Sequence, residues 1–378
     1  MLIASICLTI NSCNRMNVDW SELIPLPPPA PGAVQHGVAG PFAGLHGNTL
    51  IVAGGANFPD TMPWHGGKKL YHNEIYLLNL PPGSSSWKTI LGDDGLPAPV
   101  AYGASASVSD GVVCMGGETE SGLTDEVYII SVVGGRPLIT PLPSLPEALS
   151  GAAAASRGSM VYIAGGASPA GASGALWRLD MENIGAGWQR LADLPLPLIN
   201  SVMTASEGDR PALWLMGGRT RGEDDDTSII RPDIFRYSIA DDRWTREGEL
   251  NDGGEKVNLA AGTGAAVSRR HIALFGGNDG AVFNKVEAIL SEMSREEDTA
   301  RLASLRKEYI SLQESHPGFS RSVILVDTET GKSFRAGEIP GPAQVTTTAV
   351  VSPWGIIIPS GEIKPGIRTP EIRLVKFR

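Results

Sequence analysis

The sequence predicts an all-β fold in which one four-stranded unit is repeated six times around a closed ring. An apolar, β-prone run ending in two small residues recurs along the chain, and its first small residue stands at positions 54, 116, 165, 217, 276 and 360. A second apolar run follows each copy, and a tryptophan often comes next, at Trp87, Trp188 and Trp244. Glycine (46) and proline (28) supply about a fifth of the 378 residues, which is typical of a chain that folds but turns often.

Each repeated unit has the features of a propeller blade. A period near 50 residues with a diglycine and a later Tyr or Trp is typical of kelch repeats, which form four-stranded blades. The glycines allow steep turns where blades crowd, and the tryptophan is expected to pack between neighbouring blades. Small residues such as those at 150–154 suit the innermost strand, which faces the axis. The sequence therefore predicts a single six-bladed kelch β-propeller over residues 14–378.

The two ends of this propeller are expected to meet in one blade. The last apolar run, residues 371–377, has the position of a third strand in the sixth blade. Residues 20–23, just before a proline-rich stretch, can supply the fourth strand. Such a closure removes an exposed strand edge.

One repeat is too long, because 84 residues separate Gly276 from Ser360. Within the excess, about residues 285–312, apolar side chains recur at helical spacing, for example at Leu302, Leu305 and Tyr309. We expect two short helices inserted into blade five. They could cap the axial pocket or form a surface ornament, and we favour the cap because the insertion directly follows a diglycine loop.

Residues 1–13 are predicted to lie outside the fold. The apolar run from Leu2 to Ile10 is too short to span a bilayer and favours an export signal. Residues 10–13 resemble a bacterial lipoprotein cleavage box, in which Cys13 would carry a lipid anchor. The protein is then expected to be periplasmic or otherwise exported; the alternative is an apolar extension with no signal role. The cysteine spacing predicts neither a disulfide framework nor a zinc site.

The charge balance limits the partners. With 31 Lys and Arg against 41 Asp and Glu, the formal net charge is −10, and no basic run offsets it. Nucleic acid and anionic membrane surfaces require clustered basic side chains, so the sequence argues against both. An anionic small molecule needs only local positive charge and stays possible.

Equivalent loops of a propeller surround the same end of its central channel, so the residues after the small pairs should form one rim. These residues are Ala56, Glu118, Ala167, Arg219, Asn278 and Glu362. The loops entering the innermost strands should add His36, Tyr102, Asn200, Asn258 and Gln344. Carboxylates, an arginine and amides that converge on one funnel can bind a polar small molecule, although they could also merely solvate a channel mouth. From this set we select Glu118, Arg219, Asn278, His36 and Asn200 as candidate substrate-binding residues.

The sharpest local feature is the segment from Gly361 to Thr369, GEIKPGIRT. Its Pro-Gly pair favours a tight turn. Glu362 and Arg368 flank this turn and can face each other across it. A bare Glu–Arg pair at this spacing is common on protein surfaces, so the motif as a whole is the more specific signal.

That motif resembles the GEAKPGLRT segment of the bacterial kelch-type sialic acid (N-acetylneuraminate) mutarotase/epimerase family. Further segments agree, namely residues 37–44 with 53–56, residues 116–119 with Thr124 and Asp125, and residues 276–278 with Phe283 and Asn284. The resemblance covers nearly all six blades. The order differs, because the Glu/Arg motif here closes the chain whereas it usually precedes the GVAG-type blade. The sequence therefore resembles a cyclically permuted branch. Pro359-Ser360 also replaces the usual small pair, which could shift the Glu362 loop.

The resemblance implies an isomerase that interconverts the α and β anomers of N-acetylneuraminate, an anionic sugar, in support of sialic acid uptake and use. It implies that Glu362 and Arg368 are the catalytic residues. Anomer exchange requires removal of the anomeric hydroxyl proton and protonation of the ring oxygen, which a carboxylate can do as general base and then acid. Arg368 can clamp the sugar carboxylate, but it also favours the ionised, poorly acidic form of Glu362. Glu118 or a bound water could then be the partner acid. No metal or organic cofactor is expected.

Three other functions are compatible with a propeller. A kelch module that binds a protein partner would have no need of Glu362. A sialidase would carry repeated S-x-D-x-G-x-x-W turns, which this sequence lacks. A copper-radical oxidase would need a Cys–Tyr pair and histidine ligands, and the six histidines show no such pattern.

Overall fold

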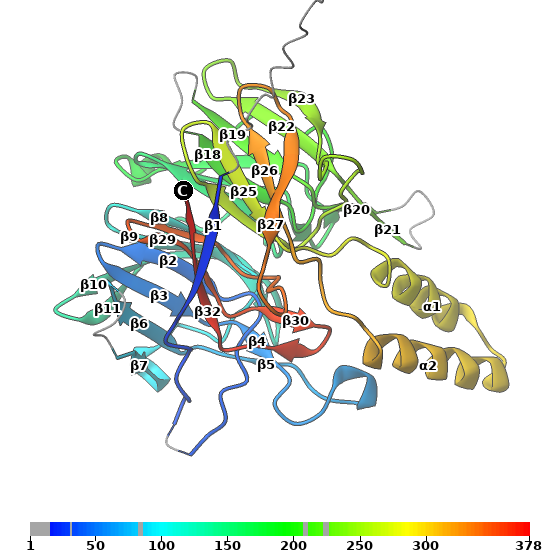
Figure 1. Cartoon of the computed structure of the whole chain (residues 1–378). Coiled ribbons are helices and arrows are strands. Elements are labelled where there is room, and N and C mark those ends of the chain that lie inside the picture. Colours follow the sequence, from blue (N-terminus) through cyan, green and yellow to red (C-terminus); the bar gives the residue numbers. More distant parts are fainter. Residues whose placement is uncertain (1–15, 31, 82–85, 207–210, 222–226) are drawn as a thin grey trace, which may run out of the picture.

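A computed structural model describes residues 16–30, 32–81, 86–206, 211–221 and 227–378. Six four-stranded antiparallel sheets surround a common axis as blades (Figure 1). The predicted six-bladed, all-β architecture is therefore confirmed. The predicted export segment, residues 1–13, lies outside the described residues.

The strands of each blade follow one another in sequence, except in the sixth blade. From the innermost to the outermost strand, blade one is β2 (Phe42–His46), β3 (Thr49–Ala53), β6 (Ile75–Asn79) and β7 (Lys88–Ile90), and blade two is β8 (Ala104–Val108), β9 (Gly111–Thr119), β10 (Gly122–Val133) and β11 (Arg136–Leu142). Blade three is β12 (Ala153–Arg157), β13 (Met160–Ala164), β16 (Leu176–Asp180) and β17 (Gln189–Arg190), and blade four is β18 (Val202–Ser206), β19 (Ala212–Met216), β22 (Asp233–Ser238) and β23 (Arg243–Glu249). Blade five is β24 (Thr263–Ala266), β25 (His271–Phe275), β26 (Ser322–Asp327) and β27 (Ser333–Glu338), and blade six is β28 (Val350–Ser352), β29 (Gly355–Pro359), β32 (Ile372–Phe377) and β1 (Val18–Leu23).

Short ladders extend four of the blades at one end of the axis. They are β4 (Ala56–Asn57) with β5 (Leu70–Tyr71), β14 (Ala167–Ser168) with β15 (Gly171–Ala172), β20 (Arg219–Arg221) with β21 (Ser228–Ile230), and β30 (Glu362–Lys364) with β31 (Ile367–Arg368). The described residues also form three 3-10 turns, η1 (Pro63–His65), η2 (Gly92–Asp94) and η3 (Ile184–Ala186).

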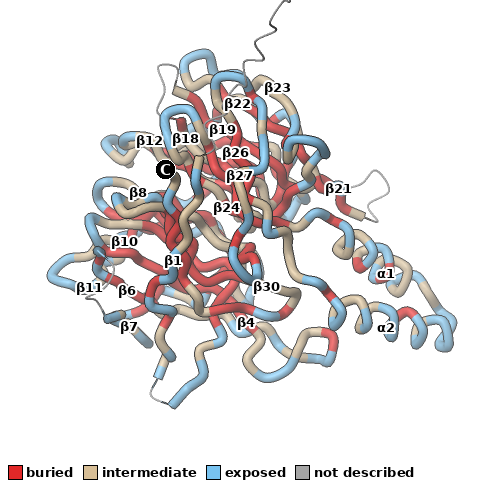
Figure 2. The backbone as a smooth tube through the Cα atoms, in the orientation of Figure 1, coloured by how far each residue is buried: buried red, intermediate tan, exposed pale blue. Residues whose placement is uncertain are grey.

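The apolar core lies between the blades. The second strands are buried on both faces, as the fully buried β3 and β19 illustrate, which explains why the sequence reads them as continuous apolar runs (Figure 2). Buried side chains form six clusters, and each cluster joins two neighbouring blades. The three predicted tryptophans also bridge blades. The indole N–H groups of Trp87, Trp188 and Trp244 donate to main-chain carbonyls just after the outermost strand of the preceding blade, at Ile24, Pro143 and Ala192.

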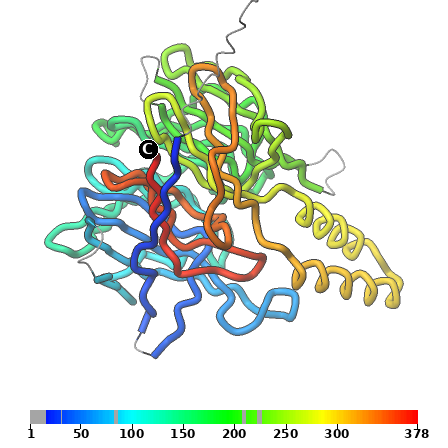
Figure 3. Tube along the Cα trace, in the orientation of Figure 1, coloured from blue at the N-terminus to red at the C-terminus, as the bar shows by residue number. Residues whose placement is uncertain are grey.

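The sixth blade joins the two ends of the chain, as predicted. Strand β1 pairs antiparallel with β32 in register from Val18 opposite Phe377 to Leu23 opposite Ile372. In Figure 3 the two strands, blue and red, run side by side. Trp20 on β1 reaches into the fifth blade, where its ring lies edge-on to Phe275 at 5.8 Å between centroids. The closure therefore contributes apolar contacts as well as main-chain hydrogen bonds.

A ring of main-chain hydrogen bonds surrounds the axis where the chain enters each innermost strand. One residue per blade donates its N–H to the carbonyl of its counterpart in the preceding blade, with lengths of 2.7–2.8 Å. All six residues have positive φ, between 49° and 64°. The members, in blade order, are Gly40, Tyr102, Gly151, Asn200, Ala261 and Thr346. Because four of them are not glycine, this conformation carries backbone strain that the closed ring of hydrogen bonds offsets.

The insertion in blade five consists of two helices, as expected, with bounds slightly wider than predicted. Helix α1 spans Phe283–Arg295 and helix α2 spans Thr299–Glu314. The Asp298 side chain caps α2 by accepting from the N–H groups of Ala300 and Arg301. Most of their length projects away from the blades (Figure 1). Within the described residues, neither these nor any other helix is long and apolar enough to cross a membrane.

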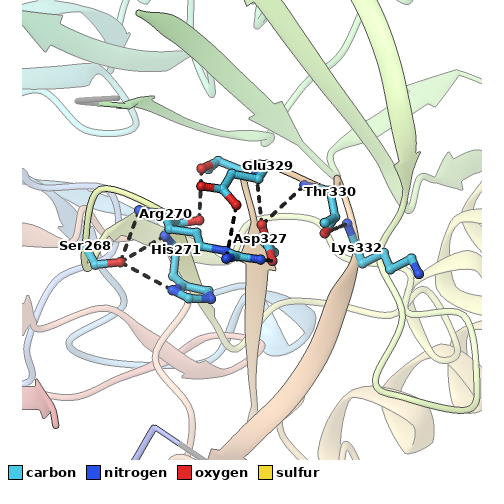
Figure 4. Close-up of polar contacts among 8 residues, drawn as sticks. Ser268, Arg270, His271, Asp327, Glu329, Thr330 and Lys332 are labelled. Carbon is cyan, nitrogen blue, oxygen red and sulfur yellow. Dashed lines mark hydrogen bonds and ion pairs between the residues drawn. The ribbon is translucent and has the colours of Figure 1, made fainter. Parts of the chain in front are cut away.

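The turns of blade five at the opposite end are held by charges. Arg270 donates from Nε and Nη2 to Asp327 Oδ2, at 3.0 and 2.6 Å, and its Nη1 lies 3.0 Å from a Glu329 oxygen (Figure 4). Asp327 also accepts from the N–H groups of Glu329 and Thr330, which shapes the turn between β26 and β27. These contacts are largely exposed and belong to the scaffold.

Replacing Trp20 tests the closure. Trp20→Ala removes the aromatic contacts between β1 and blade five, so we expect the free energy of unfolding to fall by about 2–4 kcal/mol. Ser21→Ala, on the same strand but exposed, should change it by less than about 0.5 kcal/mol. Urea denaturation of the two variants measures both values. Equal losses would show that the closing strand contributes no more than its hydrogen bonds.

Candidate active site

The six rim positions expected from the sequence are structurally equivalent. Each residue after a small pair forms an isolated antiparallel bridge with the residue that precedes a member of the hydrogen-bonded ring. The bridges are Ala39–Ala56, Ala101–Glu118, Ser150–Ala167, Ile199–Arg219, Ala260–Asn278 and Val345–Glu362. The ring therefore sets the height and spacing at which these residues meet around the axis.

Ser360 reproduces the backbone of the glycine that it replaces. The first glycines of the five diglycine pairs have φ between 59° and 66°, and Ser360 has φ of 52°. Its fully buried hydroxyl accepts from the N–H of Val38 and lies 2.8 Å from the carbonyl of Thr369. The Ser360 backbone thus matches that of the glycines at the equivalent positions, and its hydroxyl fastens the Glu362 loop to the segment before Gly40.

Glu362 and Arg368 face each other, as their positions around the turn suggest. They are paired residues of the β30–β31 ladder, and Arg368 Nη1 lies 3.3 Å from Glu362 Oε1. The same oxygen accepts from the N–H of Gly366 at 3.0 Å. The Arg368 side chain is only 4% exposed, and its guanidinium lies over the Phe58 ring, 4.8 Å from the centroid. Its Nε has no hydrogen-bond partner, and its Nη1 has no contact of this kind beyond the ion pair with Glu362.

Burial decides the proton affinity of Glu362. Loss of solvent raises the pKa of the Glu362 carboxyl above its ordinary value, although Arg368, the Gly366 N–H and Lys69 each lower it. The net direction is upward. Arg368 favours the ionised form of Glu362, as expected from the sequence, but desolvation favours the protonated form and has the larger effect on the pKa. A carboxyl with a raised pKa can both accept and return a proton near neutral pH.

Glu118 belongs to a polar cluster beside this pair. Its Oε1 accepts from Lys69 Nζ at 2.9 Å and makes a very short contact with the Tyr71 hydroxyl. Burial and the hydrogen bond to Glu118 raise the pKa of Tyr71 to about 12, so Tyr71 keeps its proton and donates. Lys69 also lies over the ring of Tyr102, 4.9 Å from its centroid. Lys69 and Tyr71 thus share one oxygen of the Glu118 carboxylate, and Glu118 does not line the cavity beside Glu362 described below.

Tyr102 connects the cluster to the Glu–Arg pair. Arg368 Nη2 lies 3.4 Å from the Tyr102 hydroxyl, and burial raises the pKa of Tyr102. The polar side chains therefore run without a break from Glu118 through Lys69, Tyr102 and Arg368 to Glu362. Sequence reasoning named Tyr102 as a rim candidate but missed Lys69 and Phe58. Both missed residues lie in the unusually long segment between the first diglycine and the next apolar run of blade one, and the length of that segment was the available signal.

A cavity of about 340 Å³ opens beside Glu362. Glu362, Arg219, Asn278 and Asn200 line it, which places four of the seven predicted site residues on one surface. The insertion supplies one wall through Phe283, Val286, Tyr309 and Gln313, and the loop after β4 supplies another through Phe58 and Trp64. The helices thus form a side wall of this cavity. It is large enough for a sugar-sized ligand.

Arg219 adds a positive charge to the wall of this cavity. It lies over the Phe283 ring, 5.6 Å from the centroid, and its Nη1 donates to the Ser228 hydroxyl at 2.9 Å. Glu287 Oε1, on α1, lies 4.0 Å from Arg219 Nη1. The Glu287 carboxylate also accepts hydrogen bonds from the N–H and the hydroxyl of Ser228. Asn278 accepts from the N–H of Gly280, and Asn200 belongs to the hydrogen-bonded ring.

The remaining candidates lie elsewhere. His36 is exposed and lines neither this cavity nor the axial channel. Gln344 is buried and donates to the carbonyls of Ser360 and Glu371, so it supports the Glu362 loop from behind. The axial channel, about 770 Å³, is lined mostly by small residues of the innermost strands, as predicted. Among the described residues, no group of three or more His, Cys, Asp or Glu could hold a metal ion.

Fold and site together define a class of protein, a six-bladed kelch propeller with a buried Glu–Arg pair at a ligand-sized cavity on its rim. Comparison with known sequences gives the family. A family model described as N-acetylneuraminate epimerase matches residues 7–138 and 142–378. The chain belongs to the N-acetylneuraminate epimerase family.

Relatives of the chain carry the same description. An N-acetylneuraminate epimerase of Brucella melitensis is 27% identical over 62% of this chain and 59% of its own length. One of Vibrio cholerae is 36% identical over 31% of each chain, and one of Haemophilus influenzae is 23% identical over 62% of this chain and 59% of its own. The chain thus spans less than two thirds of the curated relatives that it matches. The cyclic permutation stays a prediction.

Gly366 links the Glu362 turn to the wall of the cavity, and its replacement tests this packing. A Cβ at Gly366 would lie 2.9 Å from Met62 Sδ and 3.3 Å from the Trp64 ring, at a φ of 75°. Gly47, also at positive φ, has nothing within 4 Å. We expect Gly366→Ala to lower the free energy of unfolding by roughly 1 kcal/mol more than Gly47→Ala, since only the former adds a steric clash to the backbone strain. Equal losses in urea denaturation would contradict this contact.

Proposed function

We propose that the protein is an isomerase that interconverts the α and β anomers of N-acetylneuraminate. The observation that carries the proposal is the buried Glu362–Arg368 pair at the edge of a sugar-sized cavity, in a chain of the N-acetylneuraminate epimerase family. The relatives' names supply the substrate, and the site supplies residues of the right chemistry. Arg219 and Arg368 give local positive charge for an anionic sugar in a protein of net charge −10.

The proposed reaction moves one proton. Glu362 takes the proton of the anomeric hydroxyl, and the ring C–O bond breaks as the anomeric carbon becomes a keto group. The proton returns from Glu362 to the former ring oxygen. Rotation about the adjacent C–C bond presents the other face of the ketone, and the reverse steps close the ring as the other anomer. The raised pKa of Glu362 suits both directions.

Arg368 is proposed to act on both Glu362 and the substrate. Its positive charge opposes the effect of burial and keeps part of Glu362 ionised and ready to accept a proton. Its Nε has no hydrogen-bond partner and its Nη1 contacts only Glu362, which leaves donor capacity for the sugar carboxylate that the predicted clamp requires. Arg368 does not itself line the cavity, so the clamp requires Phe58 or Glu362, which do line it, to move aside. The partner acid expected from Glu118 has less support, because Lys69 and Tyr71 both donate to its Oε1 and Glu118 does not line the cavity.

Replacement of Glu362 tests the assignment. Glu362→Gln keeps the shape but cannot accept the proton, so we expect anomer exchange to slow by about 10²–10⁴-fold toward the uncatalysed rate. Proton NMR can follow decay of α-N-acetylneuraminate released by a sialidase. Glu371→Gln, which alters a second Glu–Arg contact nearby, should leave the rate unchanged. Wild-type protein that is no faster than buffer would refute the proposed function.

The pH profile tests the environment of Glu362. Exchange should fall as the pH drops through the raised pKa of Glu362, because a protonated carboxyl is no base. Arg368 lowers that pKa, so Arg368→Gln should move the midpoint of this limb to higher pH. The NMR rates at a series of pH values measure the midpoint. A midpoint that stays in place or moves to lower pH would contradict the electrostatic role of Arg368.

We further propose that the protein is periplasmic or otherwise exported and that it supports the uptake and use of sialic acid. The support is the apolar run in residues 1–13, which lie outside the described residues. Cell fractionation of the full chain and of Cys13→Ala tests both export and lipid anchoring. Retention of the full chain in the cytoplasm would refute export.

A further inference from the structure

We propose that His316 is a neutral hydrogen-bond donor for the reaction, which stabilises the negative charge that develops on the departing ring oxygen. This inference rests on the proposed function, and it names a residue that no sequence motif marked. His316 follows α2 and lines the same cavity as Glu362. It is 6% exposed and is therefore one of the few polar side chains buried at this surface.

The main chain fixes the tautomer of His316. The N–H of Gly318 donates to Nδ1 at 3.0 Å. A main-chain N–H can only donate, so Nδ1 must be the unprotonated nitrogen and Nε2 must carry the hydrogen of the neutral ring. Gly318 has φ of 100°, a conformation that favours glycine and turns its N–H back toward the ring two residues earlier. The local sequence His-Pro-Gly thus orients one specific donor.

The surroundings keep the ring neutral and in place. Burial and the charge of Lys364 lower the pKa of His316, and Asp279 opposes them only in part. The ring packs against Phe319, with 5.4 Å between centroids. The charged groups that act on His316 are therefore Lys364, on β30, and Asp279, in the loop before α1. In the described part of the chain, Nε2 of His316 hydrogen-bonds to no other group. It is also not completely enclosed by protein atoms. The donor is therefore available to a ligand.

The chemistry calls for such a donor. When Glu362 removes the anomeric proton and the ring C–O bond breaks, the electron pair of that bond leaves on the ring oxygen. A positioned N–H stabilises this charge until Glu362 returns the proton to it, and the imidazole keeps its own hydrogen throughout. Neutral histidine used as a hydrogen-bond donor is a known solution where charge develops on oxygen. Preorganised donors of this kind act mainly on the transition state.

Paired substitutions test the role. His316→Phe keeps an aromatic ring against Phe319 but removes the donor, and we expect kcat for anomer exchange to fall on the order of 10²-fold with little change in KM. His316→Gln can place an amide N–H near the position of Nε2 and should recover part of the loss. His271→Phe, at the opposite end of blade five (Figure 4), is the control and should have wild-type kinetics. Long-range ¹⁵N–¹H NMR of the wild-type histidines reads the tautomer without reference to activity.

The outcomes separate this inference from the function that it rests on. An Nε2–H tautomer together with a loss of kcat in the Phe variant that Gln partly restores would support it. An Nδ1–H tautomer, a wild-type kcat in the Phe variant, a Gln variant no better than Phe, or a change confined to KM would each overturn it while anomer exchange by the wild type still stands. Wild-type protein without any acceleration would instead refute the proposed function itself.

Discussion

The structure depends on the ring of six main-chain hydrogen bonds that joins each blade to the next at the entrance to its innermost strand. The ring closes through Thr346, which leads into the innermost strand of the sixth blade, and β1 completes that blade on its outer side by pairing with β32. The ring holds Tyr102, Asn200, Ala261 and Thr346 in a conformation that isolated residues avoid. The ring also brings the six loops to the same level along the propeller axis. One antiparallel bridge in each blade then places the residue after the small pair beside that axis.

The site combines burial with a few opposed charges. Desolvation raises the pKa of Glu362 and lowers that of His316, so Glu362 holds a proton at higher pH than an exposed carboxyl does, and the neutral form of His316 is favoured. Arg368 works against burial at Glu362, and its own guanidinium is enclosed by Phe58 and Tyr102. These groups lie on different blades and on the insertion, so their balance exists only in the folded ring. The cations Lys69, Arg219 and Arg368 are gathered at this rim, each beside a carboxylate, although the chain as a whole is acidic.

The sequence was most informative where a residue's partner lies close along the chain. Glu362 and Arg368 were predicted to face each other because a Pro-Gly turn separates them, and they do. The rim residues after the diglycines were predicted because the repeat makes them equivalent. His36 was a weaker prediction, since its loop enters the first blade four residues before the ring position, Gly40. Lys69, Trp64 and His316 were missed, because they reach the site from excursions that do not repeat and have no periodic signal.

By itself, then, the sequence determined the six blades, the closing strand, the helical insertion and the Glu–Arg turn. Each of these follows from local patterns or from repetition, which a linear chain records directly. Only the tertiary structure decided which way the pKa of Glu362 moves, which side chains enclose the cavity, and which nitrogen of His316 carries the hydrogen. Those properties depend on how far water is excluded and on contacts between residues far apart in the chain, and no local pattern encodes either.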